Sequence, residues 1–310
     1  MPFRLVPDNT TIPFMRGRIL GLVVSAILSV ASVVLFFYPG MNYGIDFKGG
    51  VLVEVRTPEP ANFAEMRAAL QQAGVGEVAL QQFGSPTEVL VRMEAQADEA
   101  AQQRSVAAVR AALEQATPGA RIVRTEAVGG RVSAELFAAG MTALGMSLLA
   151  ILIYIWFRFE WQFGVGAVIT LILDVTKAVG FLAVTRIEFD LATVAALLTI
   201  IGYSVNDKVV VYDRMRENLR KYKTMPLREL IDLSINETLS RTIGTSATAF
   251  LAMLPLALLT TGAIEGFAWT MLFGIVVGTS SSIFIAAPIL LFLGENRLRR
   301  GTEAPAAAAG

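Results

Sequence analysis

Six stretches of about 20 mostly apolar residues constrain the fold of this chain more than any other feature of its sequence. A helix that crosses a bilayer needs roughly 20 such residues, because the hydrocarbon core is about 30 Å thick. Charged residues make up only 17% of the chain, against about 25% in soluble domains. We therefore predict an α-helical polytopic membrane protein with six transmembrane helices, at about 18–38, 134–157, 162–185, 191–212, 243–262 and 266–293.

The first stretch could be mistaken for a signal peptide, because Arg16 and Arg18 precede it. However, the apolar core of a signal peptide has roughly 7–15 residues, and here it continues to Phe37 without a small-residue cleavage site. We therefore predict an uncleaved first helix, with a signal peptide as the alternative.

Basic residues set the orientation, since Lys and Arg collect in cytoplasmic loops. They lie before the first span and after the second, fourth and sixth, whereas the opposite turns near 186–190 and 261–265 hold Arg186 alone. Both termini are therefore predicted to be cytoplasmic. This prediction gives a cytoplasmic N-terminus at 1–17, helices two to six within 133–295, a cytoplasmic loop at 213–242 and a disordered cytoplasmic tail at 296–310.

Residues 39–132 differ from the spans because they are polar, charged and patterned on a short scale. They predict a small periplasmic domain of the α+β ferredoxin-like type, since the elements follow the order β-α-β-β-α-β. Such a fold does not indicate a function, and a docking or spacer module is the alternative. The predicted elements are strands Val51–Arg56, Val78–Phe83, Glu88–Met93 and Arg121–Val128 and helices Ala61–Ala73 and Asp98–Gln115.

Charged residues interrupt the third and fourth spans, and each costs about 2.5–3.5 kcal/mol near the bilayer centre. Asp174 and Lys177 are three residues apart, so they share a helix face and can pair. Asp207 and Lys208 point about 100° apart and cannot form a simple pair. We interpret Asp174, Lys177 and Lys208 as residues that compensate charge inside the membrane.

Asp207 has two interpretations. It can be structural, paired or reaching the cytoplasmic interface. Alternatively, it is a protonatable carboxylate in a wet seam beside Asn206, balanced between loss of water and the guanidinium of Arg241 at the start of span five. Such a group changes protonation when the arginine moves. Small and hydroxyl residues along spans four to six favour close helix packing around it, with ordinary packing as the alternative.

The chain lacks the residues that several classes of protein function require. The chain has no cysteine and no histidine, so we predict no disulfide and no zinc site. We find no phosphate-binding glycine loop and no nucleophile with a base, and we predict neither an enzyme nor a cofactor or metal site. The formal net charge is zero, which gives no argument for binding nucleic acid.

Sequence blocks between about residues 16 and 295 carry a resemblance to a known family. Gly44–Gly50, with Asp46, Gly49 and Gly50, follows the first span, and Ile201–Asp207 leads into a Tyr212-Asp213-Arg214 block. In this order the blocks resemble the SecD/SecF family of protein-export membrane proteins, and within it SecF, a relative of the resistance-nodulation-division transporters. The other blocks are Val132–Leu136, Phe157–Trp161, Ser240–Thr242, Glu265–Phe267 and Gly278–Ser282.

The resemblance implies a subunit of the Sec translocase that forms a heterodimer with SecD. Together they would use the proton-motive force to complete polypeptide export through the SecY channel after SecA has acted. Further implied partners are YajC, YidC, the translocating polypeptide and the lipid of the bacterial inner membrane. The family's proton-linked aspartate falls on Asp207 and its arginine on Arg241.

The chain departs from the family pattern at four positions. Lys208 replaces a small or hydroxyl residue and Lys177 an apolar residue or threonine, while Leu173 stands for a histidine and Gly130 for a proline. The two lysines add positive charge near Asp207. The alternative functions are a non-conducting scaffold that stabilises the translocase and half of a small-molecule or lipid exporter.

Overall fold

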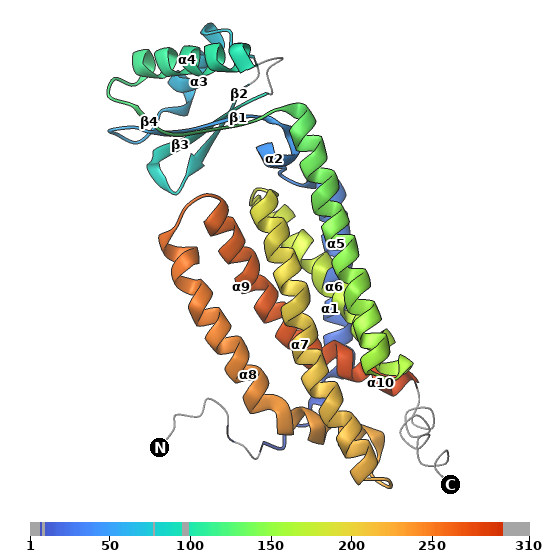
Figure 1. Ribbon diagram of the computed structural model, residues 1–310. Coiled ribbons are helices and arrows are strands. Elements are labelled where there is room, and N and C mark those ends of the chain that lie inside the picture. Colours follow the sequence, from blue (N-terminus) through green and yellow to red (C-terminus); the bar gives the residue numbers. More distant parts are fainter. Residues whose placement is uncertain (1–6, 8–9, 77, 95–98, 294–310) are drawn as a thin grey trace.

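The structure is a computed structural model of the 310-residue chain and describes residues 7, 10–76, 78–94 and 99–293. A bundle of long helices carries a small α+β domain on one end (Figure 1). Six helices are long and apolar enough to cross a membrane, as predicted. They are α1 (Arg18–Leu35, extended by the π turn Phe36–Gly40), α5 (Gly130–Arg158), α6 (Trp161–Thr185), α7 (Leu191–Lys221), α8 (Leu227–Leu259) and α9 (Ala263–Ser281), which continues through the π turn Ser282–Ala286 into α10 (Ala287–Leu293).

The fourth and fifth helices extend well past their apolar segments. The region 213–242, predicted as a loop, is mostly helical, because α7 runs to Lys221 and α8 begins at Leu227. Leu219, Leu230 and Ile231 in these extensions are buried against the bundle core. Hydropathy marks where a helix stops being apolar, but an amphipathic helix continues as long as one face packs. The predicted tail at 296–310 lies outside the described residues.

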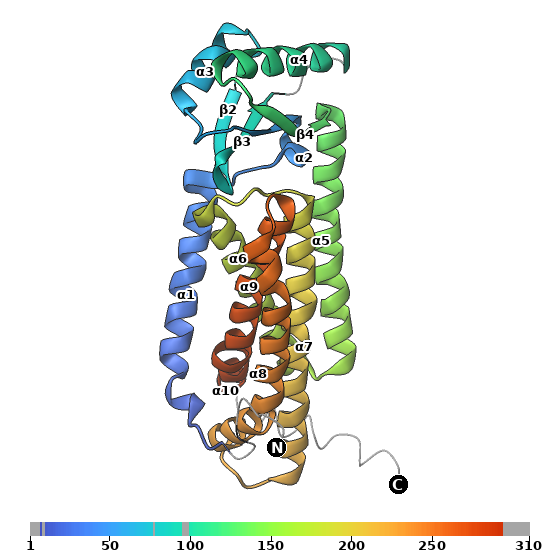
Figure 2. The same cartoon turned by 90° about the vertical axis from the view of Figure 1, so that its left-hand side faces the viewer.

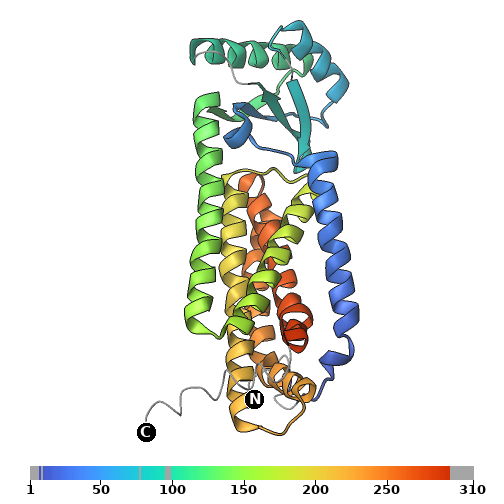
Figure 3. The same ribbon diagram turned by 90° about the vertical axis from the view of Figure 1, so that its right-hand side faces the viewer.

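The central helices hold the core of the bundle. Figure 2 and Figure 3 show α1 and α5 on opposite flanks, with α6, α7 and α9 between them. Glycines set the closest approaches. A side chain at Gly180 of α6 would collide with Ser32 of α1, and one at Gly274 of α9 would collide with Ile200 of α7. These small residues let the helix backbones come close, as in other membrane bundles.

The domain is inserted between α1 and α5 and contains a four-stranded sheet. All neighbouring strands are antiparallel, in the order β2-β3-β1-β4. Helices α3 and α4 cover one face of the sheet, and the other face is turned toward the bundle (Figure 1). The elements are α2 (Ile45–Lys48), β1 (Gly50–Arg56), α3 (Phe63–Gln72), β2 (Val78–Phe83), β3 (Ser85–Met93), α4 (Glu99–Ala116) and β4 (Arg121–Val128).

Alternation along the central strands explains the two faces of the sheet. Val51, Val53 and Val55 of β1 are buried under the helices, because successive side chains point to opposite sides. Leu52 and Glu54 consequently face the bundle. Strand β3 begins at Ser85, three residues before its predicted start, because the Gly84 turn is tighter than the sequence suggested.

Candidate functional site

A buried charge cluster joins α6, α7 and α9 inside the bundle. The Asp174 carboxylate is 1% exposed and accepts hydrogen bonds from the hydroxyls of Ser204 and Ser281, each at 2.7 Å. The ammonium of Lys208 lies 2.9 Å from it and that of Lys177 lies 3.5 Å from it. Both lysines that the sequence analysis assigned to charge compensation therefore contact this carboxylate.

Asp207 lies one position before Lys208 and points toward α9 instead of α6. It is 1% exposed, and the hydroxyl of Thr279 lies 3.5 Å from its Oδ2 atom. Thr279 shares a 2.6 Å hydrogen bond with Ser246 of α8, to which the half-buried Tyr203 donates at 3.0 Å. A chain of hydroxyl groups thus leads from the buried carboxylate to the edge of the bundle.

The structure does not bring the predicted Asp207–Arg241 pair into contact. Arg241 is exposed on the outer surface of α8, and in the described part of the chain no hydrogen bond or ion pair joins it to Asp207. Asn206 and Thr199 are likewise exposed on α7. Asp207 turns inward to Thr279, whereas the side chain of Arg241 is exposed on α8.

Sequence reasoning missed the hydroxyl ligands. Ser204 and Ser281 entered the sequence interpretation only as members of the blocks that carry the resemblance, and Ser246 did not enter it. Their signal was present, since Ser204 lies four residues before Lys208 on the same helix face and its hydroxyl contacts that ammonium. A serine one turn from a buried charge is a candidate ligand for it.

The Gly44–Gly50 segment lies at the other end of α7, beside the domain. Asp46 accepts a hydrogen bond at 3.0 Å from the backbone N–H of Leu191, the first residue of α7. Gly49 and Gly50 have φ angles of 73° and 129°, which residues with a side chain rarely adopt. These glycines let the chain turn directly from α2 into β1, so that the motif residues serve local geometry.

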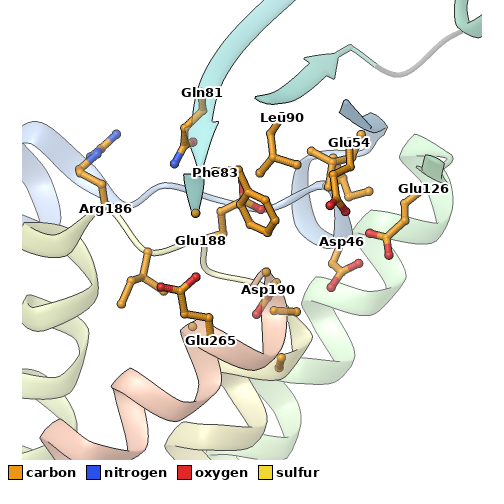
Figure 4. Close-up of a pocket in the computed structure, with 18 of the residues that line it drawn as sticks. Asp46, Glu54, Gln81, Phe83, Leu90, Glu126, Arg186, Glu188, Asp190 and Glu265 are labelled. Carbon is orange, nitrogen blue, oxygen red and sulfur yellow. The ribbon is translucent and has the colours of Figure 1, made fainter. Parts of the chain in front are cut away.

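A cavity of about 530 Å³ separates the lower face of the sheet from the bundle. Figure 4 shows acidic side chains from both sides pointing into it, including Glu54 and Glu126 from the sheet and Glu265 from α9. Burial raises the pKa of Glu188, which the Arg92 guanidinium opposes and the Asp190 and Asp46 carboxylates reinforce. Burial also raises the pKa of Asp190, although hydrogen bonds from Thr193 oppose it. Within the described ranges, no three His, Cys, Asp or Glu side chains are grouped to hold a metal ion.

These features define a class: a multi-pass membrane protein with a small external domain and a buried, charged seam between its helices. The model of the C-terminal region of the protein export membrane proteins SecD/SecF matches residues 108–296, and the SecD/SecF GG motif matches residues 34–57. The chain belongs to the SecD/SecF family, and with its six apolar helices it is a multi-pass protein of the bacterial inner membrane.

Full-length relatives and solved structures agree with this assignment. Protein translocase subunit SecF of Rickettsia akari is 44% identical over 297 residues, which cover 96% of each chain. SecF of Rhodobacter capsulatus is 42% identical, over 96% of this chain and 94% of that protein. The crystal structure of SecDF, a translocon-associated membrane protein from Thermus thermophilus, matches 94% of this chain with a TM-score of 0.85 and 33% identity. The super-membrane-facing form of SecDF matches with a TM-score of 0.63 and 31% identity, and this chain spans 40% of either SecDF chain.

Proposed function

We propose that this chain is the SecF-type subunit of the Sec translocase and that, with SecD, it uses the proton-motive force for late steps of polypeptide export through SecY, after SecA. The observation that carries the proposal is Asp207, a carboxylate fully enclosed by helices yet linked to the bundle edge by hydroxyl groups. A carboxylate buried at membrane depth costs free energy, and such residues therefore indicate a functional site. Hydroxyl chains can pass a proton without histidine, which this sequence lacks.

The proposed orientation places both termini in the cytoplasm and the domain in the periplasm. Basic residues near the start of α1, the end of α7 and the start of α8 support it, because these helix ends lie at the end of the bundle far from the domain (Figure 1). They are Arg16, Arg18, Arg214, Arg220 and Arg228. We also assign the domain to the ferredoxin-like class. Its βαββαβ order and its β2-β3-β1-β4 antiparallel sheet support that assignment.

The exposed polar side chains on α7 and α8 supply the proposed contact with SecD. Thr199, Asn206 and Arg241 are exposed at membrane depth, where lipid is a poor partner for them. The SecDF chains, of which this chain matches 40%, contain further sequence that can form such a partner. In the assembled pair, an acidic residue of SecD would meet Arg241. We extend the list of partners to SecY, YajC, YidC, the translocating polypeptide and surrounding lipid.

Proton entry would change the charge of the seam. Asp207, Asp174, Lys177 and Lys208 are all buried and their formal charges cancel, so protonation of Asp207 leaves one positive charge in excess. The helices would then shift to bring Arg241 or the lysines nearer to water or to the partner. Each elementary charge that crosses 100 mV supplies about 2.3 kcal/mol, which is enough to move a two-state element by more than tenfold.

Asp207→Asn is the direct test. We expect this variant to insert and assemble normally but to lose the stage of export that depends on the proton-motive force, measured in membrane vesicles with SecA and ATP supplied. Asp213→Asn is the matched control, because Asp213 lies on the same helix in an exposed ion pair with Arg158. Full proton-dependent export by Asp207→Asn would rule out the proposed mechanism.

A scaffold is the second candidate function, and the Asp174 cluster favours it. Its four donors satisfy the carboxylate so completely that this part of the seam has a structural explanation. A scaffold predicts that Asp207→Asn exports at the parent rate, whereas loss of the chain itself reduces SecD levels. The same vesicle assay with quantitation of SecD separates the two functions.

A further inference from the structure

A compact set of contacts fastens the small domain to the loop between α6 and α7, and we call it the joint. It consists of Gly40–Gly50, the loop Arg186–Leu191 between α6 and α7, and Arg92 of β3. Two backbone hydrogen bonds connect the two segments: Gly44 N–H donates to Phe189 at 2.9 Å, and Phe189 N–H donates to Asn42 at 2.7 Å. The side chain of Arg186 also donates to the Gly40 carbonyl at 2.8 Å.

Side chains strengthen the joint from the domain side. Arg92 forms an ion pair with Glu188 and donates to the Tyr43 carbonyl at 3.1 Å. Asp46 binds the first backbone N–H of α7, at Leu191. The centre strand of the sheet, β1, begins four residues after Asp46. A short path of direct contacts therefore runs from the first turn of α7 to the middle of the domain.

An aromatic cluster makes the joint stiff. Phe47 packs on Phe189 and on Phe137 of α5, with ring centroids 5.3 and 5.5 Å apart. Tyr43 contacts the same two rings at 5.9 and 6.3 Å. Close-packed side chains compress little and therefore pass on a displacement instead of absorbing it.

The opposite side of the domain is supported weakly. There, the tip of the β2–β3 hairpin, at Phe83 and Gly84, touches the α8–α9 turn at Thr261 and Gly262. The 530 Å³ cavity lies between this tip contact and the joint. The domain is held firmly on one side and lightly on the other, with a cavity between the two contacts. This arrangement allows the domain to rotate about the joint.

We propose that the joint transmits movement of α7 to the external domain, with Asp46 as the positioning residue that holds the two together. The inference rests on the proposed function, because α7 carries the proton-linked Asp207 sixteen residues after Leu191. A shift of α7 upon protonation would turn the domain about the joint, and the cavity would close or widen at the tip. The Gly44–Gly50 segment therefore couples the movement of α7 to the domain, in addition to forming a local turn.

Variants of Asp46 test the transmission. Asp46→Asn keeps an oxygen that can accept from Leu191, whereas Asp46→Ala removes it. We expect Asp46→Ala to lower proton-driven export by about fivefold, the factor for one lost hydrogen bond, and to leave proton uptake into proteoliposomes unchanged. Asp46→Asn should restore export, since the hydrogen bond is rescued. Parent-level proton-driven export by Asp46→Ala would overturn the proposal.

The same pair of assays keeps the two hypotheses apart. Asp207→Asn should lose both proton uptake and proton-driven export, because it removes the carrier itself. If Asp207→Asn keeps both activities, the proposed function fails. If Asp207→Asn loses both while Asp46→Ala loses neither, the proposed function holds and the joint hypothesis fails.

A reversible tether provides a second test that does not weaken the joint. The chain has no cysteine, so Gly84→Cys with Thr261→Cys introduces a single pair. A Cβ atom at Gly84 would lie 3.2 Å from the Thr261 Cγ2 atom, so the two positions are neighbours. Gly84 has a φ of 65°, which strains a cysteine there, and the reduced double variant is therefore the control. Oxidation should stop proton-driven export, and reduction should restore it in the same vesicles. Undiminished export by the fully oxidised protein would show that the domain need not move.

Discussion

The hydrogen-bond geometry predicts that loss of the Lys208 ammonium and loss of the Asp174 carboxylate lower the stability of the protein by different amounts. Lys208→Met removes the 2.9 Å ion pair but leaves Asp174 with two serine hydroxyls and with Lys177 at 3.5 Å. The loss is then about one charge-assisted hydrogen bond, or roughly 1.5–3 kcal/mol. Asp174→Asn instead removes the charge of the carboxylate that both buried ammonium groups contact. Breaking a buried pair in this way costs about 3–5 kcal/mol.

A triple apolar variant completes the design. In a parent that already carries Asp207→Asn, Asp174→Leu with Lys177→Met and Lys208→Met removes the three remaining charges of the seam together, so no buried charge remains unpaired. Because well-packed apolar replacements of buried ion pairs are often neutral or stabilising, we expect the triple variant to be within about 1 kcal/mol of the parent. Denaturation by sodium dodecyl sulfate in mixed micelles measures this order, since the three tryptophans report unfolding by fluorescence.

The refuting results are specific. Equal losses for Lys208→Met and Asp174→Asn would show that Lys177 does not share the charge of Asp174. A triple variant as unstable as Asp174→Asn would show that the loss reflects packing and not unpaired charge. The expected order, with Asp174→Asn the least stable, would show that the Asp174 cluster stabilises the packing of α6, α7 and α9.

Three further predictions concern packing, pH and the sheet. Gly274→Val should destabilise the bundle by about 1–3 kcal/mol, because the new side chain would collide with Ile200. Gly202→Ala should be tolerated, because a Cβ atom there meets open space. The same unfolding assay in mixed micelles compares the two variants. The pKa of Glu188 is raised by burial, so the folded protein binds more protons than the unfolded chain above about pH 4, and stability falls as pH rises through that window. Relative to the parent, Glu188→Gln should therefore gain thermal stability between pH 4 and neutrality, and a constant difference across that range would contradict the shift. Leu70→Ala should destabilise the small domain by about 2–5 kcal/mol, because Leu70 of α3 is fully buried against the valines of the sheet, and limited proteolysis should show cleavage within the domain while the bundle helices persist.

The sequence predicted the number and approximate position of the spans because hydropathy over about 20 residues is a strong signal. It did not predict where α7 ends and α8 begins, because their polar extensions are held by Leu219, Leu230 and Ile231, which are too sparse to raise the mean hydropathy. The strands were placed well because β-branched residues alternate with polar ones in β1 and β3.

The site was only partly predictable. Spacing alone paired Asp174 with Lys177, which the structure contains at 3.5 Å. The stronger partner, Lys208, lies 34 residues away on another helix, and no local pattern indicates which helices are neighbours. For the same reason the sequence could not show that Arg241 is exposed in the single chain. Rotation of a helix about its axis depends on the packing of all its neighbours.

The Asp174 cluster also bears on how the chain is made. During synthesis α6 can satisfy Asp174 only with its own Lys177, and α7 brings Lys208 together with Ser204. The carboxylate obtains its last donor, Ser281, when α9 has entered the membrane. Entry of α9 therefore completes the hydrogen bonding of a charge that α6 and α7 have already buried between them.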